Sequence, residues 1–310
     1  METRKMKNPS KVIALLTAFI MVLSVFAAVP PVETFAKGTE KETFYYFENS
    51  STSNKYTITI YGTTITSVKS SKPSVVKASK DSTAKYRAVL QLKKPGSSTV
   101  TVTYKNYSGR KASKKYSITV KDGTSICSFG TPTPITGECT NYTQYIYVPV
   151  KNTSKCGFSS LKIFYDLKDA AGNSVDADTK SVYYLGAGQT GYVVVNYPTS
   201  HGVDLSKSSF SVYDAEQASV GKNGSKPNKK LYSITSKLTD SGIAVTGKNK
   251  SDKSYSFNVY FFMYDANGTL CYVKSHNMYM SAKKTATDTL TRHSYDKYTS
   301  YKMKITGTSR

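Results

Sequence analysis

The aspartates of one short stretch are the residues whose type and spacing could bind a metal ion. Asp169, Asp176 and Asp178 carry carboxylate oxygens of the kind that Ca²⁺ prefers. The stretch lacks the alternating ligands and the final Glu of an EF-hand loop, and a related stretch keeps only Asp265. In both stretches a Gly follows the first Asp at the third position, which is typical of a hairpin turn with glycine at positive φ. We therefore expect turns here, with no metal and no cofactor.

Acid–base and nucleophilic chemistry has little support in the sequence. His201, His276 and His293 are far apart, and none has a Cys, His or Glu at the spacing of a metal site. The sequence contains no Gly-x-Ser-x-Gly elbow, Ser-x-x-Lys pair or Walker-type loop. Paired carboxylates for glycoside hydrolysis leave no fixed signature in a sequence, so an enzyme of that class stays an alternative. We expect no catalytic residues.

Four cysteines are too few for a disulfide framework. If one disulfide forms, we expect it between Cys127 and Cys156. A strand at 125–129 that runs antiparallel to 145–150 would place Cys127 beside the turn that follows the second strand. Cys139 would then lie at the opposite end of that pair, and Cys271 belongs to a later part of the chain.

Tyrosine is abundant, with 26 residues, and tryptophan is absent. Tyrosine rings could form a stacking platform for sugars. The alternative is that tyrosine is a strand former whose ring packs while its hydroxyl stays in water, and the absence of Trp favours this. Single-stranded nucleic acid is another stacking partner of Lys-Tyr mixtures, but an exported protein makes it an unexpected one. The candidate ligand-facing aromatics are Tyr45, Tyr46, Tyr183, Tyr184, Tyr295, Tyr298 and Tyr301.

The net charge of +23 indicates anionic partners. Of the 43 basic residues 38 are lysines, so there is no arginine cluster for bidentate phosphate or base recognition. We expect no specific nucleic acid. We expect these lysines mainly to solvate sheet faces and to protect edge strands from pairing. The alternative is that they bind a partner diffusely, and that partner would be an anionic cell-wall polymer or glycan.

Residues 1–36 are predicted to be a signal peptide. Basic residues precede an uncharged run at 12–29, and Thr34-Phe35-Ala36 offers small residues at the positions that a signal peptidase reads. Removal of this segment would leave a charge of +21. An uncleaved anchor is the alternative, because eighteen residues can just span a bilayer. We expect a secreted, extracellular or cell-wall-associated protein that meets a membrane only through this segment before cleavage.

The rest of the chain is predicted to be all-β. Short runs such as 56–60 and 100–104 alternate with period two, and turn residues separate them every eight to twelve positions. This spacing is typical of sandwiches or barrels. We expect three tandem Ig-like β-sandwich domains after the signal peptide. Their boundaries are 41–121, 125–215 and 230–310, with a polar linker at 216–229 between the second and the third.

The second and third of these domains share one pattern. Lys151-Asn152-Thr153-Ser154 and Lys248-Asn249-Lys250-Ser251 each precede an apolar run and then the Asp turn described above. Asn tolerates the left-handed conformation and bonds to nearby backbone. We therefore predict a structural role for Asn152 and Asn249, not a ligand role.

The first domain resembles bacterial Ig-like domains of group 2. The resemblance lies in the run from Val68 to Val76, with its Ser-Ser-Lys-Pro-Ser-Val step, and in the later run from Gly96 to Val102. In that family the module serves as a spacer or adhesive unit on bacterial surfaces. The aromatic residue often found before the serine pair is missing here.

The second and third domains are similar to FxLYD-like bacterial Ig-type sandwiches. The similarity rests on the strand-Asn-strand-Asp-x-x-Gly pattern and on the stretch from Tyr298 to Ile305 near the C-terminus. Together these features predict a secreted or cell-surface-associated bacterial protein that acts as a non-catalytic binding or adhesion module. The alternative is a carbohydrate-binding accessory protein that uses exposed tyrosines.

Overall fold

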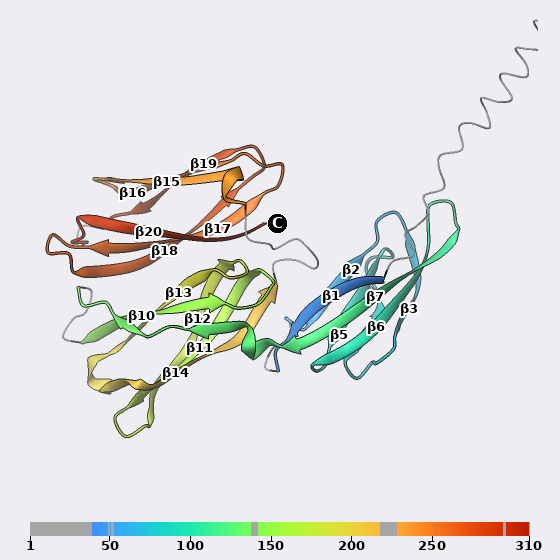
Figure 1. The fold of residues 1–310 in the computed structure, drawn as a ribbon, viewed down its shortest axis with the longest axis horizontal. Helices are drawn as coiled ribbons and strands as arrows, with labels where there is room; N and C mark the ends of the chain where they lie inside the picture. The colour runs from blue at the N-terminus through green and yellow to red at the C-terminus, as the bar shows by residue number, and fades with distance from the viewer. Residues whose placement is uncertain are drawn as a thin grey trace, which may run out of the picture. The chain divides into compact units, whose positions relative to one another are not determined.

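The computed structural model describes residues 39–309, apart from 49, 51–52, 138–141, 218–227 and 294–295. The described chain is all-β, as predicted, with twenty strands, three short 3₁₀ turns and no α-helix (Figure 1). None of its helical turns is long and apolar enough to cross a bilayer. The predicted signal peptide and most of the predicted linker lie outside the described residues.

The stretch from Thr39 to Asp122 forms two sheets. One has the strand order β1-β7-β6-β3 and the other β2-β5-β4. Side chains from both sheets, such as Leu90 and Val102, are fully buried in one core between them. The strands are β1 (Thr39–Tyr46), β2 (Lys55–Thr59), β3 (Thr64–Ser70), β4 (Val76–Lys80), β5 (Arg87–Leu92), β6 (Gly96–Lys105) and β7 (Lys111–Asp122).

The next stretch also forms two sheets, in the orders β13-β10-β8 and β12-β11-β14, with β9 paired to β10. In β8 and β10 Cys127 opposes Asn152 in an antiparallel register, which confirms the predicted pairing of these two strands. The elements are η1 (Gly123–Ile126), β8 (Cys127–Phe129), β9 (Thr133–Pro134), β10 (Thr143–Asn152), β11 (Phe158–Asp169), β12 (Ser174–Leu185), β13 (Thr190–Pro198), η2 (Thr199–His201) and β14 (Val203–Gln217).

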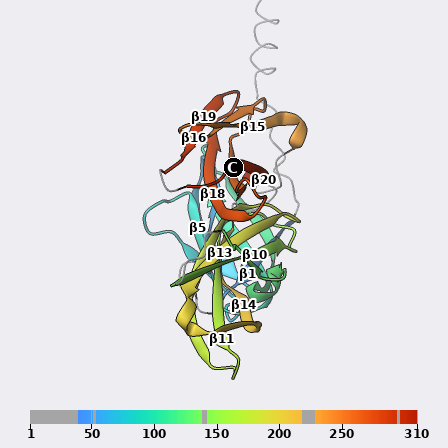
Figure 2. The same cartoon turned by 90° about the vertical axis from the view of Figure 1, so that its left-hand side faces the viewer.

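The last stretch forms the sheets β15-β16-β19 and β18-β17-β20, seen in Figure 1 and from the side in Figure 2. Their shared core contains Val245 of β16 and Phe257 of β17, both fully buried. The elements are η3 (Lys229–Leu231), β15 (Tyr232–Thr239), β16 (Gly242–Asn249), β17 (Tyr255–Tyr264), β18 (Leu270–Met280), β19 (Thr285–Thr291) and β20 (Ser300–Ser309).

The repeated asparagines are structural, as predicted, but by another route than a left-handed backbone. Asn152 is fully buried at the end of β10, and its Nδ2 donates to the carbonyl oxygens of Cys156 and Leu185 at 2.8 and 3.2 Å. Its Oδ1 accepts from the backbone N and Oγ of Ser154. Asn249 makes the same bonds one repeat later. Each side chain therefore closes the loop that follows it.

The two Asp turns are hairpins, as predicted. The backbone N of Gly172 donates to the carbonyl of Asp169, and the N of Gly268 donates to that of Asp265. Both glycines have positive φ, +90° and +79°. Asn173 donates to both carboxylate oxygens of Asp169, which lowers the pKa of that carboxyl. The carboxylate is thus used inside the turn.

Buried contacts join consecutive pairs of sheets. Tyr45 and Phe47, at the end of β1, are buried in the core of the second pair. Between the second and third pairs, Tyr192 and Phe262 belong to a further buried aromatic cluster, with ring centroids 4.9 Å apart. The ammonium of Lys304 donates to the Tyr192 hydroxyl at 2.6 Å. Adjacent sheet pairs therefore share buried surface.

Candidate functional site

The candidate site begins on the outer face of the sheet β2-β5-β4. Alternation along β5 sends Ala88 and Leu90 into the core, where both are fully buried. The opposite face then carries Gln91, which stands between Lys55 of β2 and Lys77 of β4 in the strand register. Both lysines are exposed. The pairing of three strands therefore aligns two cationic side chains on either side of an amide.

The carboxylate that lines this face, that of Asp81, is bound by neighbouring groups of the protein. Asp81 accepts hydrogen bonds from the backbone N and Oγ1 of Thr83 at 2.8 and 2.7 Å. The Nε atom of Arg87 lies 3.1 Å from its other oxygen. The bonds from Thr83, and then the charge of Arg87, hold the pKa of Asp81 below its usual value. This carboxylate is thus engaged in its own loop and with Arg87.

A groove of about 600 Å³ lies along this face. Four lysines line it, with Asp81 as the only acidic residue among the lining residues. Hydroxyls and one amide complete the polar surface. We call it the lysine groove, and it is lined by Lys55, Thr57, Lys77, Ser79, Lys80, Asp81, Ser82, Thr83, Val89, Gln91 and Lys93.

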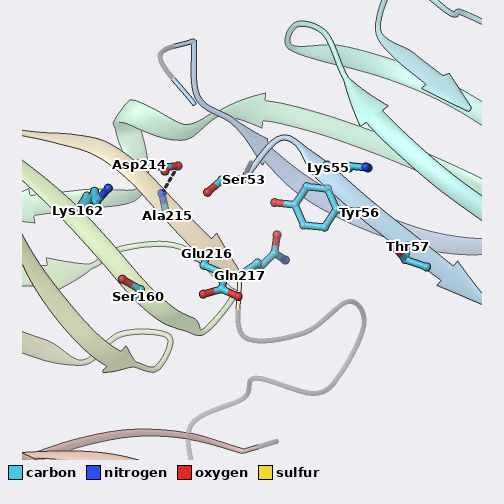
Figure 3. A pocket seen from close by; sticks show the side chains of 10 residues that line it. All are labelled: Ser53, Lys55, Tyr56, Thr57, Ser160, Lys162, Asp214, Ala215, Glu216 and Gln217. Atoms are coloured by element: carbon cyan, nitrogen blue, oxygen red, sulfur yellow. Dashed lines mark hydrogen bonds between the residues drawn. The ribbon is translucent and has the colours of Figure 1, made fainter. Parts of the chain in front are cut away.

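At one end the lysine groove meets a pocket of about 390 Å³, with which it shares Lys55 and Thr57. The other wall of this pocket comes from β11 and β14, including Lys162, Asp214 and Glu216 (Figure 3). The charge here is mixed, in contrast to the groove.

Tyr56 and Gln217 are two of the polar residues that line this pocket. The Tyr56 ring packs against Phe44, with centroids 4.3 Å apart. Burial, and then the charge of Asp214, raise the pKa of the Tyr56 hydroxyl, which therefore stays protonated and can donate. Gln217 donates from Nε2 to the Thr43 carbonyl at 3.2 Å, while its buried Oε1 has no hydrogen-bond partner in the described part of the chain.

At its other end the lysine groove meets a hollow of about 640 Å³, which shares the stretch 80–83 and continues to Tyr86. The three adjoining hollows thus run from the contact with β11 and β14, along the outer face of this sheet, to the loop that precedes β5. Their amines can hold anionic groups, and their hydroxyls and amides can hydrogen-bond to a hydroxylated ligand. An extended polymer fits such a surface better than a single small molecule.

The structure contradicts one predicted ligand-facing aromatic and weakens others. Tyr298 is 1% exposed and packs in the core of the last sheet pair, so it cannot meet a ligand. The Tyr301 ring packs against the same core, and its hydroxyl donates to Ser236. Tyr45 is buried too. Strand alternation explains these positions, because apolar ring faces are drawn inward.

The remaining predicted aromatics differ in how far they are exposed to solvent. Tyr183 is 39% exposed on β12, and its ring lies 6.3 Å from that of Tyr184 in a tilted arrangement. Tyr184 has a positive φ of 51°, which turns the chain at the end of the strand. Tyr46 is half-buried against the first core. Tyr295 lies outside the described residues.

Cys127 and Cys156 are free thiols in the structure, so the predicted disulfide is not formed there. Both pack against the core of the second sheet pair. Burial raises the pKa of Cys127 to about 12 and also raises that of Cys156. Cys139 lies outside the described residues. Cys271 is buried, and its Sγ lies beside Gly137.

The histidines and aspartates remain dispersed. His276 contacts Asp288 across the edge of the last sheet pair, with Nε2 and Oδ2 3.0 Å apart. Within the described ranges, no group of three or more His, Cys, Asp and Glu side chains could hold a metal ion.

Neither the models of known protein families nor the curated proteins match this sequence.

Proposed function

We propose that this chain is a secreted or cell-surface-associated bacterial protein that binds an anionic polymer without catalysis. The observation that supports this best is the lysine groove, which places four exposed lysines along one sheet. Neighbouring strands are about 4.8 Å apart, so the lysines that flank Gln91 stand about 10 Å apart. Amines at such a spacing can meet successive charges of one extended polymer.

The tandem architecture is consistent with this role. In our proposal the three sheet pairs are Ig-like sandwiches at 41–121, 125–215 and 230–310, preceded by a signal peptide at 1–36. The resemblance to group 2 and FxLYD-like modules favours an adhesive or spacer unit on a bacterial surface. An anionic cell-wall polymer is then the partner of matching charge.

Retention on a polyanion column tests the proposal. The full chain is loaded at low salt on immobilised cell-wall polymer and on immobilised polyphosphate, and is eluted with sodium chloride. The groove variant loses the four positive charges of the lysine groove, with Lys55, Lys77, Lys80 and Lys93 changed to Gln. A control with Lys229, Lys237, Lys248 and Lys253 changed to Gln loses the same charge from exposed positions elsewhere.

The groove variant is expected to elute at clearly lower salt than the control, because clustered amines act together on one polymer. All forms should elute by about 0.5 M salt, where charges are screened within a few ångströms. Equal elution of the two variants would show that binding is diffuse and does not use the groove. A wild-type chain that passes through both columns at low salt would refute the proposed function.

A further inference from the structure

Three exposed tyrosines gather at one end of the first sheet pair. Tyr107, in the turn between β6 and β7, is 93% exposed, and Tyr61, in the turn between β2 and β3, is 83% exposed. Tyr86, just before β5, is 37% exposed. They come from three separate loops. None of them belongs to the aromatics that the sequence pattern suggested.

Two of these rings are stacked, and the third lies over the turn that carries one of them. Those of Tyr61 and Tyr86 are stacked, with centroids 5.9 Å apart and planes inclined by 26°. The Tyr107 ring lies over Gly62, the residue next to Tyr61, so closely that a Cβ there would collide with it. Gly62 also has a positive φ of 72°, which glycine adopts without strain. A glycine thus allows the Tyr107 ring to pack over the turn that carries Tyr61.

The turns that carry the rings are fixed by hydrogen bonds. Thr63 Oγ1 donates to the Ile60 carbonyl at 2.7 Å across the first turn. In the second turn, Asn106 Oδ1 accepts from Arg110 N at 2.9 Å, and the Asn106 carbonyl accepts from Gly109 N. The rings are therefore presented to solvent by ordered loops. Exposed apolar surface gathered in one place is typical of a binding site.

The tyrosine cluster adjoins the lysine groove. Tyr86 lines the same hollow as Lys80, Ser82, Thr83 and Lys85. An aromatic face can pack against the C–H face of a sugar ring, and the neighbouring hydroxyls and amines can bond to the sugar's polar groups. The exposed surface of the stacked Tyr61 and Tyr86 rings suits a ligand that lies along the surface better than a side chain inserted into a pocket.

We propose that Tyr61, Tyr86 and Tyr107 form a stacking platform for sugar rings of an acidic polysaccharide whose charges follow the lysine groove. This platform rests on the proposed function, because it assigns the chemistry of the polymer that the groove binds. It also gives the carbohydrate-binding alternative a site other than the predicted one.

Fluorescence anisotropy of a labelled hyaluronan oligosaccharide, titrated with the full chain, tests the platform. The aromatic variants are Tyr61→Ala, Tyr86→Ala and Tyr107→Ala, and the three Tyr→Phe changes keep the rings. Tyr279→Ala is the matched control, since that tyrosine is 51% exposed on the third sheet pair. Neutral dextran, polyphosphate and a single-stranded oligonucleotide serve as competitors. Thermal unfolding checks that each variant is folded.

Each Tyr→Ala change should weaken hyaluronan binding about tenfold, which corresponds to about 1.4 kcal/mol. The Tyr→Phe variants and Tyr279→Ala should bind as the wild type does. Polyphosphate binding should be unchanged in all of them, so the groove and the platform can fail separately. Unaltered hyaluronan binding in the Tyr→Ala variants would overturn the platform, as would a wild type that binds polyphosphate but no hyaluronan. Tyrosine-dependent binding of the oligonucleotide alone would overturn the choice of a polysaccharide.

Discussion

At the scale of single residues, the buried asparagines carry much of the loop structure. Replacing Asn152 by Ala leaves the carbonyls of Cys156 and Leu185 without the donor that now reaches them. An unsatisfied buried polar group costs about 1–3 kcal/mol, so we expect the free energy of unfolding to fall by about 3 kcal/mol. Urea denaturation measures the change. Asn196→Ala, at an exposed position on β13, is the control and should change it by less than about 0.5 kcal/mol. A similar loss in both variants would contradict the role of the side chain.

The partly buried thiol of Cys127 gives a second prediction at this scale. Its pKa is raised by burial from 9.0 to about 12, so the folded state keeps the proton at pH values where the unfolded state has lost it. The stabilising contribution is therefore complete below pH 9 and decreases as the pH rises from 9 towards 12. Between about pH 9 and pH 11, this thiol should cost the wild type roughly 2 kcal/mol of unfolding free energy. Under reducing conditions, Cys127→Ala should not show that part of the loss.

Denaturation curves at several pH values measure this difference, with Ser128→Ala on the same strand as the control. An identical pH dependence in wild type and Cys127→Ala would contradict the raised pKa. Under oxidising conditions, peptide mapping tests the predicted Cys127–Cys156 link. A link between Cys139 and Cys271 would show another pairing instead.

At the scale of elements, the two Asp hairpins should respond alike to the loss of glycine. Gly172 and Gly268 have positive φ, and a Cβ at either position would meet open space. The cost of Ala is therefore conformational only, about 1 kcal/mol in each turn. Urea unfolding of Gly172→Ala and Gly268→Ala checks this, and Ala171→Ser, exposed in the first turn, should be neutral. Unequal losses would mean that the turns are not equivalent.

Period-two alternation predicted the strands well where one face meets the core. In β5, Ala88, Leu90 and Leu92 are buried while the residues between them are partly exposed. In β17 the pattern differs, because Phe257 and Val259 face the core of their own sheet pair while Tyr260 and Phe262 face the second pair. The continuous apolar run of β17 was the signal for burial on both faces.

The binding surfaces were not predictable in the same way. The lysine groove depends on the register of three strands, β2, β5 and β4, and β2 is not next to its partner β5 in the sequence. The tyrosine cluster depends on three loops that meet only in the folded state. A local signal existed in Tyr61-Gly62, since a tyrosine in a glycine turn is exposed more often than one in a strand. Several of the tyrosines predicted to face a ligand, such as Tyr45 and Tyr298, are instead packed in a core.

At the scale of the whole molecule, the contact between the second and third sheet pairs changes an expectation from the sequence. A polar linker suggests that trypsin would release the third part as a separate fragment. The aromatic cluster with Tyr192 and Phe262 is buried between them, so we expect the nicked chain to stay together in gel filtration under native conditions. Phe262→Ser should allow the fragments to separate, and Tyr279→Ser, exposed on the same part, should not. Immediate separation of the wild-type fragments would refute a stable contact.

The parallel pairing of β1 with β7 has a mechanical consequence. Thr39 opposes Lys115 and Tyr46 opposes Asp122, so the chain enters this sheet at one end of the ladder and leaves it at the other. Tension between the two ends of this stretch therefore acts along the strands and loads all the hydrogen bonds of the ladder at once. An antiparallel pair pulled from one end would open one bond at a time. A protein that links a surface to a polymer under flow would resist detachment by shear at this ladder.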